Sequence, residues 1–388
     1  MREQGVMDLL RAEGPMSRAE IARRCGVSKP TVASHVETLL ALGLVEERGR
    51  GASGTGRPGR LLAFRPAAGC VIGMDIGGTT TRAVLADLDG AVLATHREPT
   101  AAGSADALLS QLARIVSQLS DGSPCRAPVL EVAIGTPGVV DQVRRRIDIA
   151  PNLPALEAEG FLDRLDAALG GSVTVLNDVN AAIRGELEDG AGRGVDDLVY
   201  LSIGTGLGLG VVVAGAVHHG VAGRAGEFGL LPSPPGGSTV LEDALSGRGV
   251  RARSIAAGGD GNPETAFQQA DAGLEPGASV IAAFEADLVW ALAAVATLLD
   301  PRCVVLGGGI GLRCAPRIDR IGADVARLTG FDLDLRVAEL GDDAGLAGAV
   351  AAALGPARDV RRWMEGGPPR SIPCRHPPEP VADPHPRT

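Results

Sequence analysis

The sequence predicts an α/β protein: a small N-terminal domain followed by two similar α/β lobes. The first 65 residues are basic and fit three short helices and a hairpin. An apolar strand, a glycine turn and a second strand then occur twice, at DIGGTTTRAVLADLDG (75–90) and LVYLSIGTGLGLGVVVAGAV (198–217). A third apolar strand runs into a glycine turn at CVVLGGGIG (303–311). Two copies of one hairpin indicate a duplicated unit with a cleft between its halves.

The composition is that of a globular protein, because 45% of the 388 residues are apolar and 22% are charged. No apolar run approaches the roughly 20 residues that a membrane span needs, and the N-terminus lacks the pattern of a signal peptide. We therefore expect a cytoplasmic protein without a membrane partner. The six cysteines form no C-x-x-C or C-x-C pair, which favours free thiols over disulfides or a closed zinc site.

The charge is distributed unevenly along the chain. Residues 1–65 carry 11 Lys and Arg against 7 Asp and Glu, whereas the remainder carries 26 against 40. Lys29 is the only lysine in the chain. A basic module on an acidic body suits a DNA-binding head, since neutralising phosphates requires local positive charge.

The N-terminal segment contains signals for a helix-turn-helix. A capping box, Ser17-Arg-Ala-Glu20, opens the second helix; Gly26 supplies a tight turn, and Ser28 caps the third helix. Short polar side chains near the start of such a helix are suited to reading the major groove. The residues that we expect to face DNA from this helix are Ser28, Lys29, Thr31, Ser34 and His35.

The segment that follows, LVEERGRGASGTGRPGRLLAF (44–64), has the pattern of a hairpin with a glycine-rich basic tip. Such a wing can follow the DNA backbone or enter a minor groove, and Arg57 and Arg60 are its predicted contacts. The alternative is a three-helix module with a flexible linker. Residues 1–66 resemble the winged-helix domains of many bacterial regulators.

The glycine turns of the body favour a phosphate site when they are considered together. A single glycine hairpin is usually just a turn, and GTGLGLG is followed by a strand, which argues against a Rossmann site. Three such loops, each after an apolar strand, can offer backbone N–H groups to oxyanions. Asp75 could hold a hydrated Mg²⁺ beside them.

The order of these hairpins resembles the ROK family (repressors, open reading frames and kinases). The motifs that carry the resemblance are DIGGTTT, GTPGVVD, APNLP, LNDVNAA, SIGTGLGLG, AGEFG, VLEDALSG and VVLGGGI. The resemblance covers residues 69–355 and implies two ribonuclease H-like lobes of the actin and sugar-kinase type. It places the small lobe at 69–178 with a returning helix at 344–355, and the large lobe at 179–343. A proline-rich stretch at 364–388 is expected to be a disordered tail.

The resemblance also implies roles for individual residues. Asp178 matches the catalytic base of the family's kinases, where a carboxylate takes the proton of a sugar hydroxyl. The implied sugar-binding residues are Asn152, Asn177, Asp178, Glu227 and Glu242. The implied nucleotide-binding residues, for ATP with Mg²⁺, are Asp75, Gly77, Gly78 and Thr79 in the first phosphate loop, Gly204, Thr205 and Gly206 in the second, and Gly308 and Gly309 in the adenosine turn.

Two departures from the family pattern bear on function. Thr80 stands where the first phosphate loop usually continues with lysine. The family's zinc module is degenerate, because Leu230 replaces its histidine, Val240 replaces its last cysteine, and the other two cysteines are absent. Since a structural zinc needs four N or S ligands, we expect no metal in this loop and an altered ligand preference.

Three hypotheses follow. The first is a transcriptional regulator, most simply a repressor, that binds double-stranded operator DNA as a homo-oligomer, dimer or tetramer, and senses a sugar or sugar derivative. The second is an ATP-dependent sugar kinase that uses Asp178 as its base. The third is a regulator that binds ATP without turnover.

Overall fold

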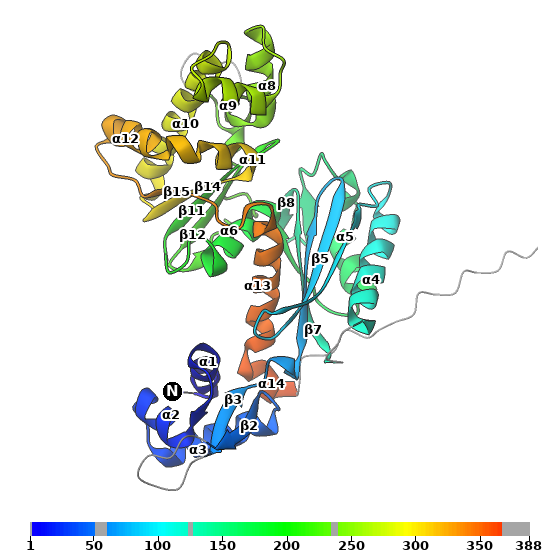
Figure 1. Cartoon of the computed structure of the whole chain (residues 1–388). Helices are drawn as coiled ribbons and strands as arrows, with labels where there is room; N and C mark the ends of the chain where they lie inside the picture. Colours follow the sequence, from blue (N-terminus) through cyan, green and yellow to red (C-terminus); the bar gives the residue numbers. More distant parts are fainter. Residues whose placement is uncertain (1, 51–59, 123–126, 234–239, 367–388) are drawn as a thin grey trace, which may run out of the picture.

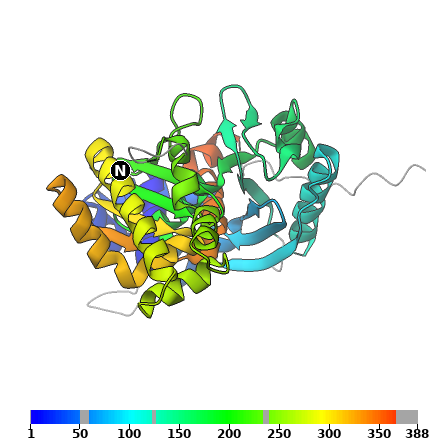
Figure 2. The same cartoon turned by 90° about the horizontal axis from the view of Figure 1, so that it is seen from above.

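The computed structural model describes residues 2–50, 60–122, 127–233 and 240–366. They form a helical head and two α/β lobes (Figure 1). Figure 2 shows the two lobes side by side, with α4 and α5 on the side of the small lobe that is remote from the large lobe. Residues 364–366 lie in a helix, and the rest of the predicted tail, 367–388, lies outside the described residues.

The head is a winged helix-turn-helix, as predicted. Its elements are α1 (Glu3–Glu13), β1 (Met16–Ser17), α2 (Arg18–Cys25), α3 (Lys29–Ala41), β2 (Val45–Arg50) and β3 (Arg60–Phe64), with the strands in the order β1-β3-β2. The Ser17 hydroxyl accepts a hydrogen bond from the Glu20 N–H, and that of Ser28 accepts one from the Thr31 N–H. Gly26 ends α2 with a φ of 65°, in the left-handed region that glycine adopts without strain. The local signals therefore place both helix starts and the turn.

The small lobe is a five-stranded sheet in the order β10-β7-β4-β5-β6. Its strands are β4 (Cys70–Ile76), β5 (Thr80–Asp87), β6 (Val92–Pro99), β7 (Val129–Thr136) and β10 (Thr174–Asn177), and the short hairpin β8 (Val139–Asp141) and β9 (Arg146–Asp148) lies apart from the sheet. The helices α4 (Ala105–Asp121) and α5 (Phe161–Leu169) pack with one face into an apolar core. The helix α13 (Ala344–Arg358) packs against the other face.

The large lobe repeats this plan in the order β13-β12-β11-β14-β15. Its elements are β11 (Leu198–Ile203), β12 (Leu207–Val213), β13 (Ala216–Val217), α7 (Leu241–Leu245), α8 (Gly247–Ala256), α9 (Pro263–Asp271), α10 (Gly277–Leu299), β14 (Cys303–Gly307), α11 (Gly308–Gly311), α12 (Ile318–Thr329) and β15 (Leu335–Val337). In each lobe an antiparallel hairpin, β4–β5 or β11–β12, pairs with a parallel neighbour, β7 or β14. The predicted duplication is confirmed.

The helix α10 corrects one expectation. It has 23 residues and a mean hydropathy of 1.8 in its most apolar window, so by length and composition it could cross a membrane. Half of that window is buried inside the protein, and its buried residues, Phe284 and Leu288 among them, belong to the large-lobe core. Glu285 and Asp287 interrupt the apolar sequence, which is why counting uninterrupted runs missed this helix. Its position is that of a core helix packed on α9 and α12.

The helix α13 connects the two lobes and the head (Figure 1). Near its start it crosses α6 (Asp178–Asp189) so closely that a Cβ on Gly348 would lie 1.7 Å from the Ala181 carbonyl oxygen. At its end it continues into α14 (Val360–Gly366), where the Val360 N–H donates to the Gln4 side chain of α1 at 2.9 Å. The apolar core of the head is continuous with that of α13, α14 and the small-lobe sheet. The head is therefore packed firmly on the body.

Candidate functional site

Asp178 lies at the junction of the two lobes, at the start of α6 directly after β10. The preceding residue, Asn177, caps the helix by accepting hydrogen bonds from the Val179 and Asn180 N–H groups, and its Nδ2 donates to the Gly138 carbonyl at 3.0 Å. These bonds fix the first turn of α6. Asp178 is left exposed to solvent, with one carboxylate oxygen 2.8 Å from the Val179 nitrogen.

Asp178 is an exposed residue, yet the groups around it affect the ionisation of its carboxyl. This environment raises its pKa to about 6, first through desolvation and then through the negative charges of Asp75 and Glu227. The pKa of Glu227 is raised too, by burial and by Glu242. The structure thus brings together the four carboxylates that were predicted from separate motifs. Carboxylate oxygens accept hydrogen bonds, so these four side chains together can bind several hydroxyl groups of a polyol.

The predicted first phosphate loop is the turn between β4 and β5. The Gly77 N–H donates to the Thr80 carbonyl at 2.9 Å, while Thr79 is exposed. Gly78 packs against the loop of Asn152, because a Cβ on Gly78 would lie 2.7 Å from the Asn152 carbonyl oxygen. Asn152 is therefore an exposed residue adjacent to this turn, and its implied role in sugar binding stays a prediction.

Asp75 differs from the expectation that it holds a hydrated Mg²⁺. Its Oδ2 accepts hydrogen bonds from Arg82 Nη2 at 2.6 Å and from Arg82 Nε at 3.2 Å. Arg82 Nη1 also donates to Asp343 at the start of α13, at 2.9 Å. A guanidinium therefore stands where a metal would neutralise this carboxylate, and the first loop does not fit a metal ion held by Asp75.

Arg82 is a residue that the sequence interpretation missed. It is the cross-strand partner of Asp75 in the β4–β5 hairpin. The hairpin and its tight turn were predicted, and together they fix which residues lie opposite each other. Because opposite residues on adjacent antiparallel strands lie within contact distance, the pairing of Arg82 with Asp75 could have been predicted from the sequence.

The predicted second phosphate loop is the turn between β11 and β12, and residues of the same lobe hold it in place. The Gly204 carbonyl accepts a hydrogen bond from the Gly247 N–H at 2.7 Å, and the Thr205 carbonyl accepts one from Arg248 Nε at 3.1 Å. Glu242 forms an ion pair with Arg248 and accepts from the Leu207 N–H at 3.1 Å. The carboxylate of Glu242 thus lies against this loop, where a Cβ on Gly206 would meet it at 2.9 Å.

The predicted adenosine turn begins the short helix α11. Gly308 has a φ of 74°, and a Cβ there would lie 2.5 Å from the Ile203 carbonyl oxygen of β11, so only glycine fits. Gly309 has open space around it, with nothing within 4 Å of a Cβ. The backbone at Gly309 is thus accessible to a ligand.

The degenerate zinc region offers apolar groups in place of ligands. Leu230 and Val240 are exposed side chains, and residues 234–239 lie outside the described part of the chain. Among the described residues, no group of three or more His, Cys, Asp or Glu side chains could hold a metal ion. Leu230 and Val240 have no side-chain atom that can ligate a metal ion, so these two positions do not fit a zinc site.

The residues predicted to face DNA are only partly free of contacts with other side chains. Ser28, Lys29, Thr31 and Ser34 are exposed on α3, as expected. His35 is different: its Nδ1 lies 2.8 Å from a Glu3 carboxylate oxygen of α1, and its side chain is only 16% exposed. On the wing, Arg60 forms an ion pair with Glu47 of β2, whereas Arg57 lies outside the described residues.

Comparisons with known proteins identify the body and the head separately. Residues 71–355 match the family model described as "ROK family", and residues 4–48 match a helix-turn-helix domain. The chain belongs to the ROK family. With its helix-turn-helix head, it has the domain organisation of a ROK transcriptional regulator, and its body has the fold of the family's sugar kinases.

The similar proteins include both kinases and repressors. A glucokinase of Streptomyces coelicolor is 31% identical over an alignment of 318 positions, which covers 74% of this chain and 98% of the kinase. The xylose repressor of Bacillus subtilis is 30% identical over 56% of each chain. A crystal structure of a ROK-family transcriptional regulator, a homologue of the E. coli MLC protein, is 22% identical and has a TM-score of 0.78. The match covers 94% of this chain and 98% of that regulator's chain. The three-part fold is therefore shared over nearly the whole length.

Proposed function

We propose that this chain is a sugar-responsive transcriptional repressor in which the ROK body binds a sugar or sugar derivative and the head binds operator DNA. The observation that carries the proposal is the path of α13. At its start Asp343 contacts Arg82 and hence Asp75, and at its end Val360 of the following helix contacts Gln4 of the head. One helix therefore links the group of carboxylates to the DNA-binding domain.

A ligand between the lobes can act on DNA through this helix. A polyol that bonds to Asn177 and Asp178, where β10 meets α6, and to Glu227 on the large lobe would draw the lobes together. Because α6 and α13 cross without room to slide past each other, their movement would be transmitted along α13. In a homo-oligomer this would change the spacing of two recognition helices on a palindromic site.

The test is a selection from fragmented genomic DNA of the source organism, with the full-length chain and a Lys29→Ala variant as the control. We expect a sharp peak that contains an inverted repeat. Its binding should fall steeply with salt, with a log–log slope of roughly −4 to −5 if four to six phosphates are neutralised, and Lys29→Ala should reduce that slope by about 1. Retention of DNA without sequence enrichment, or a slope near zero, would contradict the proposal.

A second candidate function is an ATP-dependent sugar kinase, favoured by the exposed Asp178 and the open backbone at Gly309. A carboxyl with a pKa of about 6 is mostly ionised at pH 7.5 and is suited to take a proton from a sugar hydroxyl. The guanidinium on Asp75 is unfavourable for this function, because phosphoryl transfer depends on a metal ion that bridges the phosphates. A screen of aldoses and amino sugars with ATP and Mg²⁺ tests for this activity. Phosphoryl transfer to one of these sugars that is lost in Asp178→Asn would establish that the chain is a kinase.

A further inference from the structure

His35 lies on α3, the recognition helix, but neither nitrogen of its ring is available to DNA. Nδ1 lies 2.8 Å from Oε1 of Glu3 on α1. Nε2 is buried and has no hydrogen-bond partner among the residues that the structure describes. A histidine binds a base edge or a phosphate through a ring nitrogen. The polar atoms of His35 therefore face the protein and not DNA.

Glu3 accepts this hydrogen bond as an ionised carboxylate. The pKa of Glu3 is lowered, first by a hydrogen bond from its own backbone N–H and then by the hydrogen bond from His35. An ionised carboxylate can only accept, so Nδ1 carries the hydrogen. The side chains of His35 and Glu3 are 16% and 21% exposed, so the contact is largely shielded from solvent. A charge-assisted hydrogen bond therefore joins the recognition helix to α1.

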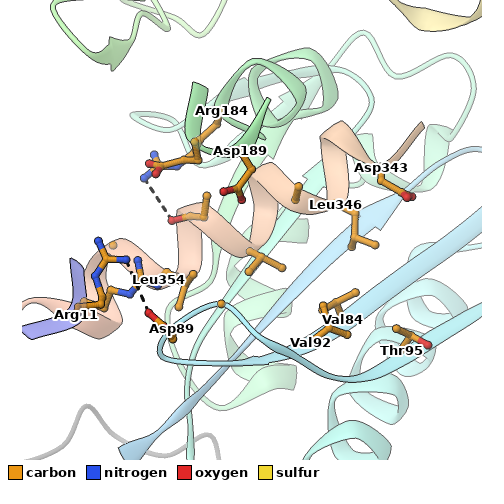
Figure 3. A pocket seen from close by; sticks show the side chains of 17 residues that line it. Arg11, Val84, Asp89, Val92, Thr95, Arg184, Asp189, Asp343, Leu346 and Leu354 are labelled. Atoms are coloured by element: carbon orange, nitrogen blue, oxygen red, sulfur yellow. Dashed lines mark hydrogen bonds and ion pairs between the residues drawn. The ribbon is translucent and has the colours of Figure 1, made fainter. Parts of the chain in front are cut away.

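The helix α1 is itself fixed to the body near both of its ends. Gln4, the neighbour of Glu3, accepts a hydrogen bond from the Val360 N–H at 2.9 Å, at the start of α14. Near the other end, Arg11 lies 4.0 Å from Asp89, in the turn between β5 and β6. Figure 3 shows this contact in the wall of the pocket between the head and the body. The body therefore holds α1, and α1 holds the recognition helix.

The bond to Glu3 lies where it can fix the part of α3 that is predicted to read DNA. His35 is one turn beyond Thr31 on this helix. Thr31, Ser28 and Lys29 are exposed at the start of the same helix. Apolar packing has no preferred direction, whereas a hydrogen bond weakens steeply when its angle changes. An anchor one turn away therefore selects one rotation of α3 about its axis, and reading a base edge requires such a fixed geometry.

We propose that His35 is a positioning residue of the DNA-binding head. Its hydrogen bond to Glu3 fixes the rotation of α3 relative to α1 and, through the contact of Gln4 with Val360, relative to the body. This role rests on the proposed function, because it is a role in binding operator DNA. A movement of α13 reaches the recognition helix through two consecutive residues of α1, Glu3 and Gln4, and not through the apolar core alone.

The test measures the affinity of the full chain for two duplexes by fluorescence anisotropy: the operator enriched in the genomic selection and a scrambled duplex of the same composition. The readout is the ratio of the two dissociation constants, since a change of net charge affects both duplexes alike. We expect His35→Leu and Glu3→Ala each to lower this ratio roughly tenfold, the equivalent of one base contact. Because both variants break the same bond, the double variant should stay within about twofold of the single variants.

Two further variants separate positioning from other roles. His35→Asn keeps an N–H donor on a δ atom for the bond to Glu3, so its ratio should stay within about threefold of that of the natural chain. Lys29→Ala removes a predicted phosphate contact and should lower the salt slope by about 1, whereas His35→Leu should leave the slope unchanged. If His35→Leu does not fold, Glu3→Ala and His35→Asn, alone and combined, decide the matter.

The outcomes distinguish the role of His35 from the proposed function. Effects of His35→Leu and Glu3→Ala that multiply in the double variant, or a ratio that Glu3→Ala leaves unchanged, would overturn the proposal, because His35 would then act without Glu3. A ratio that falls in His35→Asn as far as in His35→Leu would overturn it too, since packing alone would explain both. A natural chain that binds both duplexes equally would contradict the proposed function and this role with it, whereas the other outcomes contradict only the role of His35.

Discussion

The hairpins β4–β5 and β11–β12 have the same backbone plan but differ in what they are connected to. Each turn lies beside a carboxylate that is neutralised by an arginine. In the small lobe the pair is Asp75 with Arg82, both on the hairpin itself, and Arg82 continues to Asp343 of the α13 junction. In the large lobe the pair is Glu242 with Arg248, from α7 and α8, and the Arg248 side chain is 69% exposed.

For the proposed function, this difference favours the small lobe as the part that acts on the head. The small-lobe turn is tied through Arg82 to the helix that reaches the head, whereas the contacts of the large-lobe turn stay within its own lobe. A ligand between the lobes would therefore act on DNA binding through the small-lobe pair, and the large lobe would serve as the moving part. Four predictions test this comparison.

The crossing of α6 and α13 should be the most sensitive point. Gly348→Ala would place a Cβ 1.7 Å from the Ala181 carbonyl oxygen, which requires a backbone shift. We expect a loss of about 3 kcal/mol in the free energy of unfolding, measured by urea denaturation. The control is Gly322→Ala in α12, where nothing lies within 4 Å of a Cβ and the helix should gain up to about 1 kcal/mol. Equal effects at both positions would contradict a tight crossing.

The two arginine pairs should differ in the same assay. Arg82→Met leaves Asp75 without its counter-charge at a position where both side chains are 21% exposed, so we expect a loss of roughly 2 kcal/mol. Arg248→Met removes a pair that is mostly in solvent and should cost less than about 0.5 kcal/mol.

The same pair of variants should also separate signalling from stability. Arg82→Met should abolish the effect of a sugar on DNA binding, whereas Arg248→Met should retain it. If both variants keep the full response to the sugar, the small-lobe pair does not transmit the signal.

The sequence predicted what depends on neighbouring residues. The helix starts at Ser17 and Ser28 and the turn at Gly26 follow from local hydrogen bonds and backbone freedom, and the duplicated hairpins follow from alternating apolar strands. Periodicity also placed His35 on the outer face of α3. The structure partly covers it, because Glu3 belongs to a helix 32 residues earlier that packs beside it.

What the sequence did not predict depends on residues that are far apart in the chain. Gln4 and Val360 are 356 positions apart, and nothing local shows that they form a hydrogen bond. The approach of Gly348 to Ala181 requires the return of α13 to the small lobe, which only the family resemblance indicated. The register of the hairpin predicts the contact of Arg82 with Asp75. It does not predict the second partner of Arg82, Asp343, which is 261 positions later in the chain.

The last prediction concerns the pH dependence of stability at Asp178. Its folded-state pKa of about 6 lies above its ordinary value of 3.8, so the folded state binds more protons than the unfolded state between these values. The contribution of this group to stability is therefore present at low pH and is lost as the pH rises towards 6. Asp178→Asn keeps the oxygen that accepts from the Val179 N–H, and it should raise stability at pH 7.5 by on the order of 1 kcal/mol, since solvent screening reduces the full effect of the shift. At pH 4 the variant and the natural chain should unfold at the same urea concentration. A stability difference that does not change with pH would mean that burial and the charges of Asp75 and Glu227 together do not raise the pKa of Asp178.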